Sequence, residues 1–134
     1  MDAAARDMVR QRAGGRCEYC HFPDHALDLP FHVDHIVAIV HGRDDDPSNL
    51  AWACRRCNLG KGPNLTTIDP ASVERVDLFN PRTMVWSEQF AVSDGQVVGL
   101  TACGRGTVRL LDMNNDQRVQ HRFVLIANGE FDVD

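Results

Sequence analysis

Residues 31–62 read FHVDHIVAIVHGRDDDPSNLAWACRRCNLGKG. Residues 31–36 alternate apolar and polar side chains, which predicts a short strand. A polar turn follows, and residues 50–53 predict a second short strand. Residues 54–62 predict a helix that a Gly-Pro pair ends. The stretch therefore predicts two short strands followed by a helix.

Four of the five cysteines form two C-x-x-C pairs, one before the first strand and one at the start of the helix. Thiolates are soft ligands that suit tetrahedral zinc, and four of them commonly form a closed structural site. A unit this small buries little surface, so a bound metal would stabilise it. A buried reduced pair, a redox pair and an iron site are the alternatives. The predicted zinc ligands are Cys17, Cys20, Cys54 and Cys57.

Polar residues with complementary chemistry occupy the same stretch. Cleavage of a phosphodiester needs a water nucleophile, a base for its proton and a cation for the developing charge. His35 suits the base, because imidazole titrates near neutral pH. Asp34 and Asn58 offer hard oxygen ligands to Mg²⁺, which often needs only one or two protein ligands. An amide oxygen at Asn58 favours Mg²⁺ or Mn²⁺ over zinc at this position.

The motifs FHVDHI, then HG with NL six residues later, then CRRCNLGKG, resemble the HNH endonucleases of the ββα-metal fold. The preceding RCEYC is similar to the first half of that family's zinc-binding variant. Asn49 lies 14 residues after His35 and Asn58 a further 9, which is typical of the family. The resemblance covers residues 16–62. Residues 78–82 and 101–114 resemble the C-terminal part of small bacterial HNH proteins and carry no functional residues.

The resemblance implies a ββα-metal core and a role for each matched residue. His35 is then the general base, and Asp34 and Asn58 hold Mg²⁺ or Mn²⁺ on the scissile phosphate, with cleavage leaving a 5′ phosphate. Asn49 shapes the loop so that the Nδ1 side of His35 is oriented and Nε2 faces the attacking water. Three basic residues are expected at the substrate phosphates: Lys61, Arg55 and Arg56.

Each of these residues also has an ordinary interpretation when taken alone. An Asp-His pair is often surface or capping chemistry, Asn49 follows Pro-Ser as a turn residue would, and Asn58 and Lys61 could be solvated on a helix. Their joint occurrence in this order, with the cysteine pairs in place, favours the site.

Other polar residues carry less weight. The acidic run at residues 44–46 is expected to be solvated in the polar turn over 41–48. His32 could support Asp34, and His41 is expected to be a loop residue. His21 and His25 lie beside the first cysteine pair, but four cysteines already complete a tetrahedron. Unpaired Cys103 and both tryptophans, Trp52 and Trp86, are expected to pack in the interior.

The chain has 134 residues, of which 43% are hydrophobic and 25% charged, and its net charge is −5. This size and composition suit a single modest core. The acidic excess lies mostly in the second half, while Arg55, Arg56 and Lys61 are local positive charges near the motif. Tight unaided binding to a polyanion is therefore not expected, and a homodimer or protein partner could assist. The chain shows neither a secretory signal nor a membrane-spanning run, so we expect a cytoplasmic protein.

The remaining sequence predicts a helix over residues 3–13 and a mixed extension after residue 62. Residues 63–85 have little periodicity, whereas residues 86–92 and 96–100 flank Ser93-Asp94-Gly95 and predict a hairpin. A helix capped by Thr101 is expected to run to Asp112. A last helix over 116–128 is expected to bury Val119, Phe123 and Ile126.

The sequence thus predicts an α+β protein with a ββα-metal core and a four-cysteine zinc knuckle in residues 1–62. A β-hairpin and helical extension, residues 63–134, is expected to pack on that core as one structural unit. The expected function is metal-dependent endonuclease activity on nucleic acid, with double-stranded DNA favoured. The alternative is a catalytically silent zinc module that binds nucleic acid or protein, and a ribonuclease or structure-specific nuclease on the same site is the third interpretation.

Overall fold

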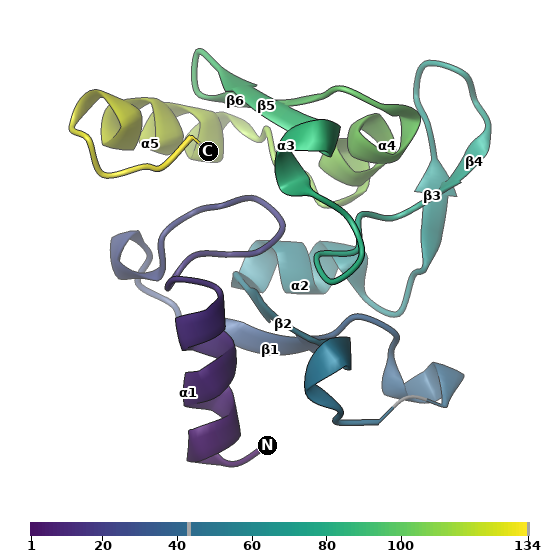
Figure 1. Cartoon of the computed structure of the whole chain (residues 1–134). Helices are drawn as coiled ribbons and strands as arrows, with labels where there is room; N and C mark the ends of the chain where they lie inside the picture. Colours follow the sequence, from purple (N-terminus) through teal and green to yellow (C-terminus); the bar gives the residue numbers. More distant parts are fainter. Residues whose placement is uncertain (43, 134) are drawn as a thin grey trace.

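The computed structural model describes residues 1–42 and 44–133 and confirms the α+β class, with helices and small antiparallel hairpins (Figure 1). The α-helices are α1 (Ala3–Arg12), α2 (Arg55–Lys61), α3 (Trp86–Gln89), α4 (Ala102–Leu110) and α5 (Asp116–Ala127). Short 3-10 helices lie at η1 (Asp24–Ala26), η2 (Ile39–His41) and η3 (Pro47–Asn49). The strands are β1 (His32–His35), β2 (Leu50–Ala53), β3 (Thr66–Ile68), β4 (Arg75–Asp77), β5 (Phe90–Ser93) and β6 (Gln96–Gly99).

The β1–β2 hairpin and α2 form the predicted core unit. β1 pairs antiparallel with β2, and His35 lies opposite Leu50 at the end of the ladder. All four residues of β2 are buried, so this strand forms the centre of the unit. Cys54 caps α2 by accepting a hydrogen bond from the Cys57 amide, and α2 then contacts β1. One position of the predicted polar turn, Arg43, lies outside the described residues.

Helix α1 lies against this unit and begins where the sequence predicts. Asp2 caps it by accepting from the amide of Ala5 at 2.7 Å. Val9 is its only buried residue, in line with the weak apolar stripe of its sequence. Arg6 stacks over the Trp52 ring, 4.6 Å from the ring centroid, and Arg12 donates to the Leu50 carbonyl. Helix α1 is therefore attached to β2 mainly through its arginines.

The second half contains a hairpin that the sequence did not predict. Strands β3 and β4 pair antiparallel between residues 66 and 77. The turn between them is organised by Asp69, a fully buried carboxylate that accepts from Arg105 Nε at 3.0 Å and Nη2 at 2.9 Å. The hydrogen bonds from Arg105 hold the pKa of Asp69 well below its ordinary value. An ion pair to α4 thus fixes a turn 36 residues away in the sequence.

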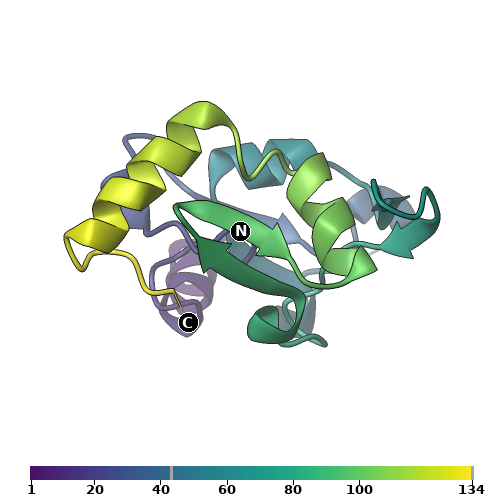
Figure 2. The ribbon, with the colours of Figure 1, turned by 90° about the horizontal axis from the view of Figure 1, so that it is seen from above.

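The predicted β5–β6 hairpin is confirmed, but the expected strand over residues 86–92 begins later. Its first residues form the single helical turn α3, because Trp86 is buried and donates its indole N–H to the Tyr19 carbonyl at 2.8 Å. Both tryptophans lie in the core, as predicted. Seen from above, the hairpin lies between α5 and α4 (Figure 2).

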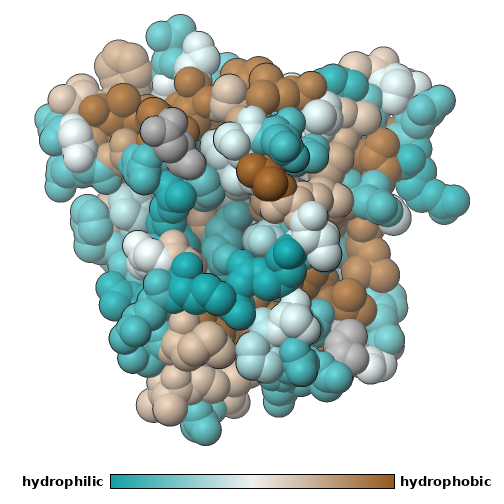
Figure 3. Space-filling model, viewed as in Figure 1, coloured by the Kyte–Doolittle hydropathy of each residue, from teal (hydrophilic) through white to brown (hydrophobic). Residues whose placement is uncertain are grey.

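Helix α5 is present, but the expectation that Phe123 would be buried was wrong. Arg122 and Leu125 are the buried residues of α5, whereas Phe123 is 55% exposed and Val124 is also exposed. Apolar side chains gather over α5 and the β5–β6 hairpin on the face shown in Figure 3. In the described part of the chain, no helix is long and apolar enough to cross a membrane.

Candidate zinc and catalytic sites

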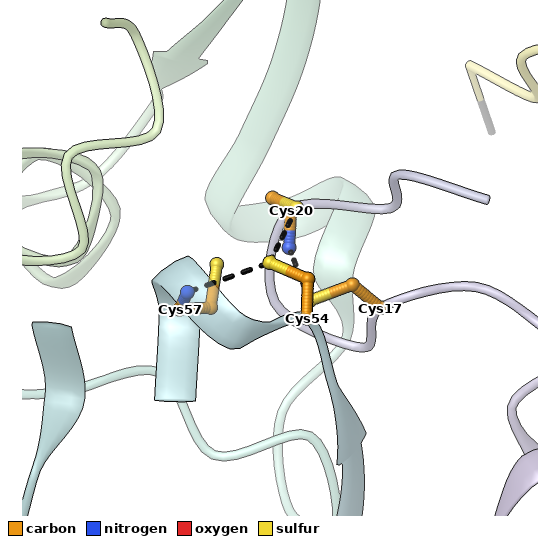
Figure 4. Close-up of side chains that lie close together, drawn as sticks. All are labelled: Cys17, Cys20, Cys54 and Cys57. Carbon is orange, nitrogen blue, oxygen red and sulfur yellow. Dashed lines mark hydrogen bonds between the residues drawn. The ribbon is translucent and has the colours of Figure 1, made fainter. Parts of the chain in front are cut away.

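The four cysteines of the two C-x-x-C pairs come together in the interior (Figure 4). Their sulfur atoms all lie within 4.8 Å of one another, and all four residues are buried. A tetrahedral zinc with Zn–S bonds of about 2.3 Å places neighbouring sulfurs about 3.8 Å apart. The Sγ atoms of Cys20 and Cys54 are 3.8 Å apart. The cluster is therefore compatible with a structural zinc ion.

The local chain explains why the cysteines converge. The amide of Cys17 donates to the Phe22 carbonyl at 2.9 Å, which closes the first pair into a tight turn. The Glu18 amide donates to the Trp52 carbonyl at 2.8 Å, and the Glu18 carboxylate accepts from the Trp52 amide at 2.8 Å. These bonds attach the turn to β2. Only Cys54 separates the end of β2 from the start of α2, so the two cysteine pairs are brought together. Burial raises the pKa of the Cys17 thiol, so a bound cation would be needed to keep it as a thiolate.

Neither histidine beside the first pair joins the cluster. The His21 ring stacks on Trp86 with 3.9 Å between the ring centroids, and His25 is exposed. Burial, together with the charge of Arg16, lowers the pKa of His21 to about 3, so the ring stays neutral. The four-cysteine set predicted from the spacing is the one that the fold assembles.

Asn49 organises the loop that follows β1. Its side-chain oxygen accepts from the Val37 amide at 2.9 Å, and its side-chain nitrogen donates to the carbonyls of Val37 at 3.0 Å and Asp44 at 3.2 Å. The backbone carbonyl of Asn49 accepts from the Ile36 amide at 2.8 Å. Asn49 therefore ties both ends of the loop next to His35. Its part in catalysis stays a prediction.

Asp45, which the sequence left in a solvated acidic run, contacts the predicted base. Its Oδ1 lies 2.7 Å from Nε2 of His35. The side chain of His35 is 21% exposed and that of Asp45 is 71% exposed, so the pair lies at the surface. The expectation that Nε2 faces the attacking water is not met in this arrangement. The neighbouring Asp46 caps η3 through the Ser48 amide at 2.9 Å.

Asp34, the predicted metal ligand, points into the protein. Its Oδ2 accepts from the Tyr19 hydroxyl at 2.6 Å and lies 3.3 Å from Lys61 Nζ. Burial raises the pKa of Asp34, and the charge of Lys61 opposes that rise. Burial and the nearby carboxylate raise the pKa of Tyr19. Tyr19 is a partner that the sequence motif does not reveal, because nothing in C-E-Y-C marks its side chain.

Lys61 is almost completely buried, with 2% of its side chain exposed. Its ammonium also donates to the His35 carbonyl at 3.1 Å. In this arrangement Lys61 holds β1 to the end of α2 and leaves little surface for a substrate phosphate. Asn58 lies three residues before Lys61 on α2 and is partly exposed. Its part in metal binding stays a prediction.

Arg55 and Arg56 are exposed at the start of α2. Arg56 pairs with Asp112 at 2.8 Å. Both arginines line a cleft of about 710 Å³ between α2 and α5, whose walls also include Leu59, Asn115 and Arg118. His41, expected to be a loop residue, lies in η2 with its Nε2 2.9 Å from the Pro63 carbonyl. The cleft therefore offers basic groups beside the helix that carries Asn58.

Residues 17–64 match the family model of the HNH endonucleases. The match begins at Cys17, the first cysteine of the cluster, and ends just after α2, so it covers the β1–β2–α2 unit and both cysteine pairs. A search of curated proteins returned no match. The chain therefore contains an HNH endonuclease domain built around a four-cysteine cluster.

Proposed function

We propose that this chain, whose residues 17–64 form an HNH endonuclease domain, hydrolyses phosphodiester bonds in nucleic acid with His35 as the general base. The family match supports a nuclease in general. The placement of His35 supports its role as the base. His35 ends β1, contacts Asp45 and lies next to the loop whose backbone Asn49 holds by hydrogen bonds. A base whose ring is oriented by its neighbours is what proton abstraction from water requires.

The contact with Asp45 determines which nitrogen can act. An ionised carboxylate only accepts hydrogen bonds, so neutral His35 paired with it carries its proton on Nε2. The lone pair then lies on Nδ1, and we assign proton abstraction to that atom. Asp45 would orient the ring and stabilise the imidazolium that forms, which is the role a carboxylate plays toward a catalytic histidine in other hydrolases. This replaces the expectation, drawn from resemblance alone, that Nε2 is the base.

A divalent cation, Mg²⁺ or Mn²⁺, would be held by Asp34 and Asn58. Carboxylate and amide oxygens are the hard donors these ions prefer. When bound, the ion would stabilise negative charge on the phosphate and the leaving oxygen. The buried ammonium of Lys61 now supplies positive charge to Asp34 at 3.3 Å. We therefore propose that Lys61 and the cation compete for this carboxylate.

Double-stranded DNA is the proposed substrate, with Arg55 and Arg56 as phosphate contacts. Both are exposed on α2, and an arginine fork suits phosphate oxygens. The net charge of −5 argues for few such contacts, so a homodimer or protein partner would add affinity. We also propose that residues 1–62 form the nuclease core and that residues 63–134 pack on it, so that the two parts form one structural unit. We also propose a cytoplasmic location, because the cysteine pairs are spaced for metal binding rather than for a disulfide framework.

One observation favours the alternative of a silent zinc-stabilised binding module. Asp34 already has two partners, Tyr19 and Lys61, and only 5% of the residue is exposed. A carboxylate committed to the interior would serve stability rather than metal binding. The two functions differ in whether the purified protein cleaves nucleic acid at all.

The test is incubation of purified, chelator-treated protein with supercoiled plasmid, with and without added Mg²⁺ or Mn²⁺. The proposal expects nicked or linear plasmid only when a divalent ion is present. Single-stranded DNA and RNA of equal length run in parallel distinguish a deoxyribonuclease from a ribonuclease. Intact nucleic acid in every arm, from protein that still holds zinc, would establish the silent module instead.

A further inference from the structure

The C-terminal helix α5 places an arginine on the cysteine cluster. Nη1 of Arg118 lies 3.5 Å from Sγ of Cys54 and 3.9 Å from Sγ of Cys20. These are hydrogen-bond distances for an N–H donor and a sulfur acceptor. Arg118 lies far outside the matched residues 17–64, and Figure 1 shows α5 beside the loop that carries the first cysteine pair. The contact therefore joins the extension to the predicted zinc ligands.

Local packing holds Arg118 in this orientation. Its amide is capped by Oδ1 of Asn115 at 3.1 Å at the start of α5. Its guanidinium stacks over the Phe22 ring, 4.8 Å from the ring centroid. Phe22 itself closes the first cysteine turn through its carbonyl. Phe22 therefore closes the turn that carries Cys20 through its backbone and supports the arginine that faces it through its ring.

A second arginine of α5 is buried nearby without an acidic partner. Arg122 is fully buried and donates to the carbonyls of Gly95 at 2.7 Å and Met113 at 3.0 Å. Within residues 1–42 and 44–133, no carboxylate forms an ion pair with it. Its guanidinium carbon lies 5.7 Å from the centroid of the Phe22 ring, on which Arg118 also stacks. A buried cation of this kind needs a compensating negative charge.

A zinc ion with four thiolates supplies that negative charge, because four negative ligands around a divalent cation leave a net charge of about −2. We propose that Arg118 is a positioning residue of the zinc centre, donating to the thiolates of Cys54 and Cys20, and that Arg118 and Arg122 together balance the charge of the centre. The inference rests on the zinc site described above. It makes α5 part of the metal centre, so zinc retention depends on a helix outside the HNH unit.

Removal of the donor should weaken zinc binding without removing a ligand. Loss of a group that hydrogen-bonds a metal ligand typically costs about 10–100-fold in metal affinity. Arg118→Met removes the N–H groups and the charge but keeps an unbranched side chain to pack on Phe22. Arg118→Lys keeps the charge but loses the planar fork, so it should be intermediate. Arg109→Gln is the matched control, because Arg109 is an exposed arginine on α4.

The experiment measures zinc release from the full-length protein to a chromogenic chelator, and the absorption of the Co²⁺-substituted protein. Arg118→Met should bind zinc about 10–100-fold less tightly than the wild type. Its sulfur-to-cobalt charge-transfer band should move to lower energy, because thiolates without a hydrogen bond are easier to oxidise. The zinc affinity and band position of Arg118→Lys should lie between those of the wild type and Arg118→Met. Both values should be unchanged in Arg109→Gln.

An unchanged band and zinc affinity within twofold of the wild type in Arg118→Met would overturn the proposal, even if its thermal stability fell. That result would make Arg118 a packing residue of Phe22. If Arg118→Met does not fold, Arg118→Lys decides, because the proposal requires measurably faster zinc release from it than from the wild type. If the wild-type protein contained no zinc, the prediction of a zinc site would be wrong. That outcome is distinguished from a failure of the Arg118 proposal by measuring zinc in the wild type first.

Discussion

The carboxylate of Asp45 lies 2.7 Å from Nε2 of His35, although Asp45 lies ten residues further on, within the loop that joins β1 to β2. Asn49 closes this loop from within by bonding to Val37 and Asp44. The contact therefore depends on the loop geometry and not on neighbouring positions in the sequence. It gives a histidine at the end of a strand a partner that can fix the orientation of its ring.

Asp45→Asn should lower the rate of cleavage by about 10–100-fold, the usual effect of removing a group that orients an active histidine. An amide can donate as well as accept, so it would no longer fix the proton on Nε2. Zinc content and thermal stability should be unchanged, because the side chain of Asp45 is mostly exposed. Steady-state plasmid cleavage measures the effect, with Asp94→Asn in the β5–β6 turn as control. Equal rates for Asp45→Asn and the control would show that the contact is incidental.

Replacement of Cys54 with Ser should cost folding as well as activity. Cys54 is both a predicted zinc ligand and the N-cap of α2, and metal binding and folding are coupled in small zinc units. We expect one zinc per wild-type chain by elemental analysis, and loss of cooperative unfolding in Cys54→Ser. Cys103→Ser, outside the cluster, is the control. A well-folded wild-type sample without zinc would contradict the prediction.

Two ion pairs of α2 should differ greatly in their contribution to stability. Lys61→Met leaves the Asp34 carboxylate buried without its cation, which typically costs about 3–5 kcal/mol. Arg56→Gln breaks an exposed pair with Asp112, which is worth about 0–1 kcal/mol. Chemical denaturation at neutral pH compares the two variants. Similar free energies of unfolding for both would show that Lys61 is not paired inside the protein.

DNA binding should be weak and should decrease as salt is added. Few phosphate contacts are expected from a chain of net charge −5, and each contact releases counterions when it forms. Arg55→Gln should weaken binding to every duplex by a similar factor. It should also make the negative slope of log K against log salt shallower by about one unit. Fluorescence anisotropy with a labelled duplex, in chelator to prevent cleavage, gives both values. A binding constant that barely changes between low and moderate salt would exclude this mode of binding.

Much of the core was predictable because its signals are local. The β1 and β2 strands, the helix that follows and the convergence of the cysteines all follow from alternation, turn residues and ligand spacing within residues 17–62. The β5–β6 hairpin and the cap of α4 by Thr101 also follow from short patterns.

The remainder depended on contacts between distant residues. The β3–β4 hairpin has mostly exposed, three-residue strands, so it lacks periodicity, and its turn is fixed by Arg105 on α4. The inward face of α5 was mispredicted because Arg122 takes an interior position that hydrophobic periodicity assigns to an apolar residue. In the same way, the partners of His35 and Asp34 are set by loop closure and by Tyr19, which no motif records.

The most direct test of the proposed function is the metal dependence of plasmid cleavage by His35→Ala beside Asn58→Ala. General-base loss typically slows a reaction by about 10²–10⁴-fold, so His35→Ala should be nearly inactive at every Mg²⁺ or Mn²⁺ concentration. Asn58→Ala should regain activity as metal is added, because mass action offsets a weakened ligand set. Zinc content and thermal stability should stay at wild-type values in both. Cleavage by His35→Ala at the wild-type rate would contradict the assignment of His35 as the base.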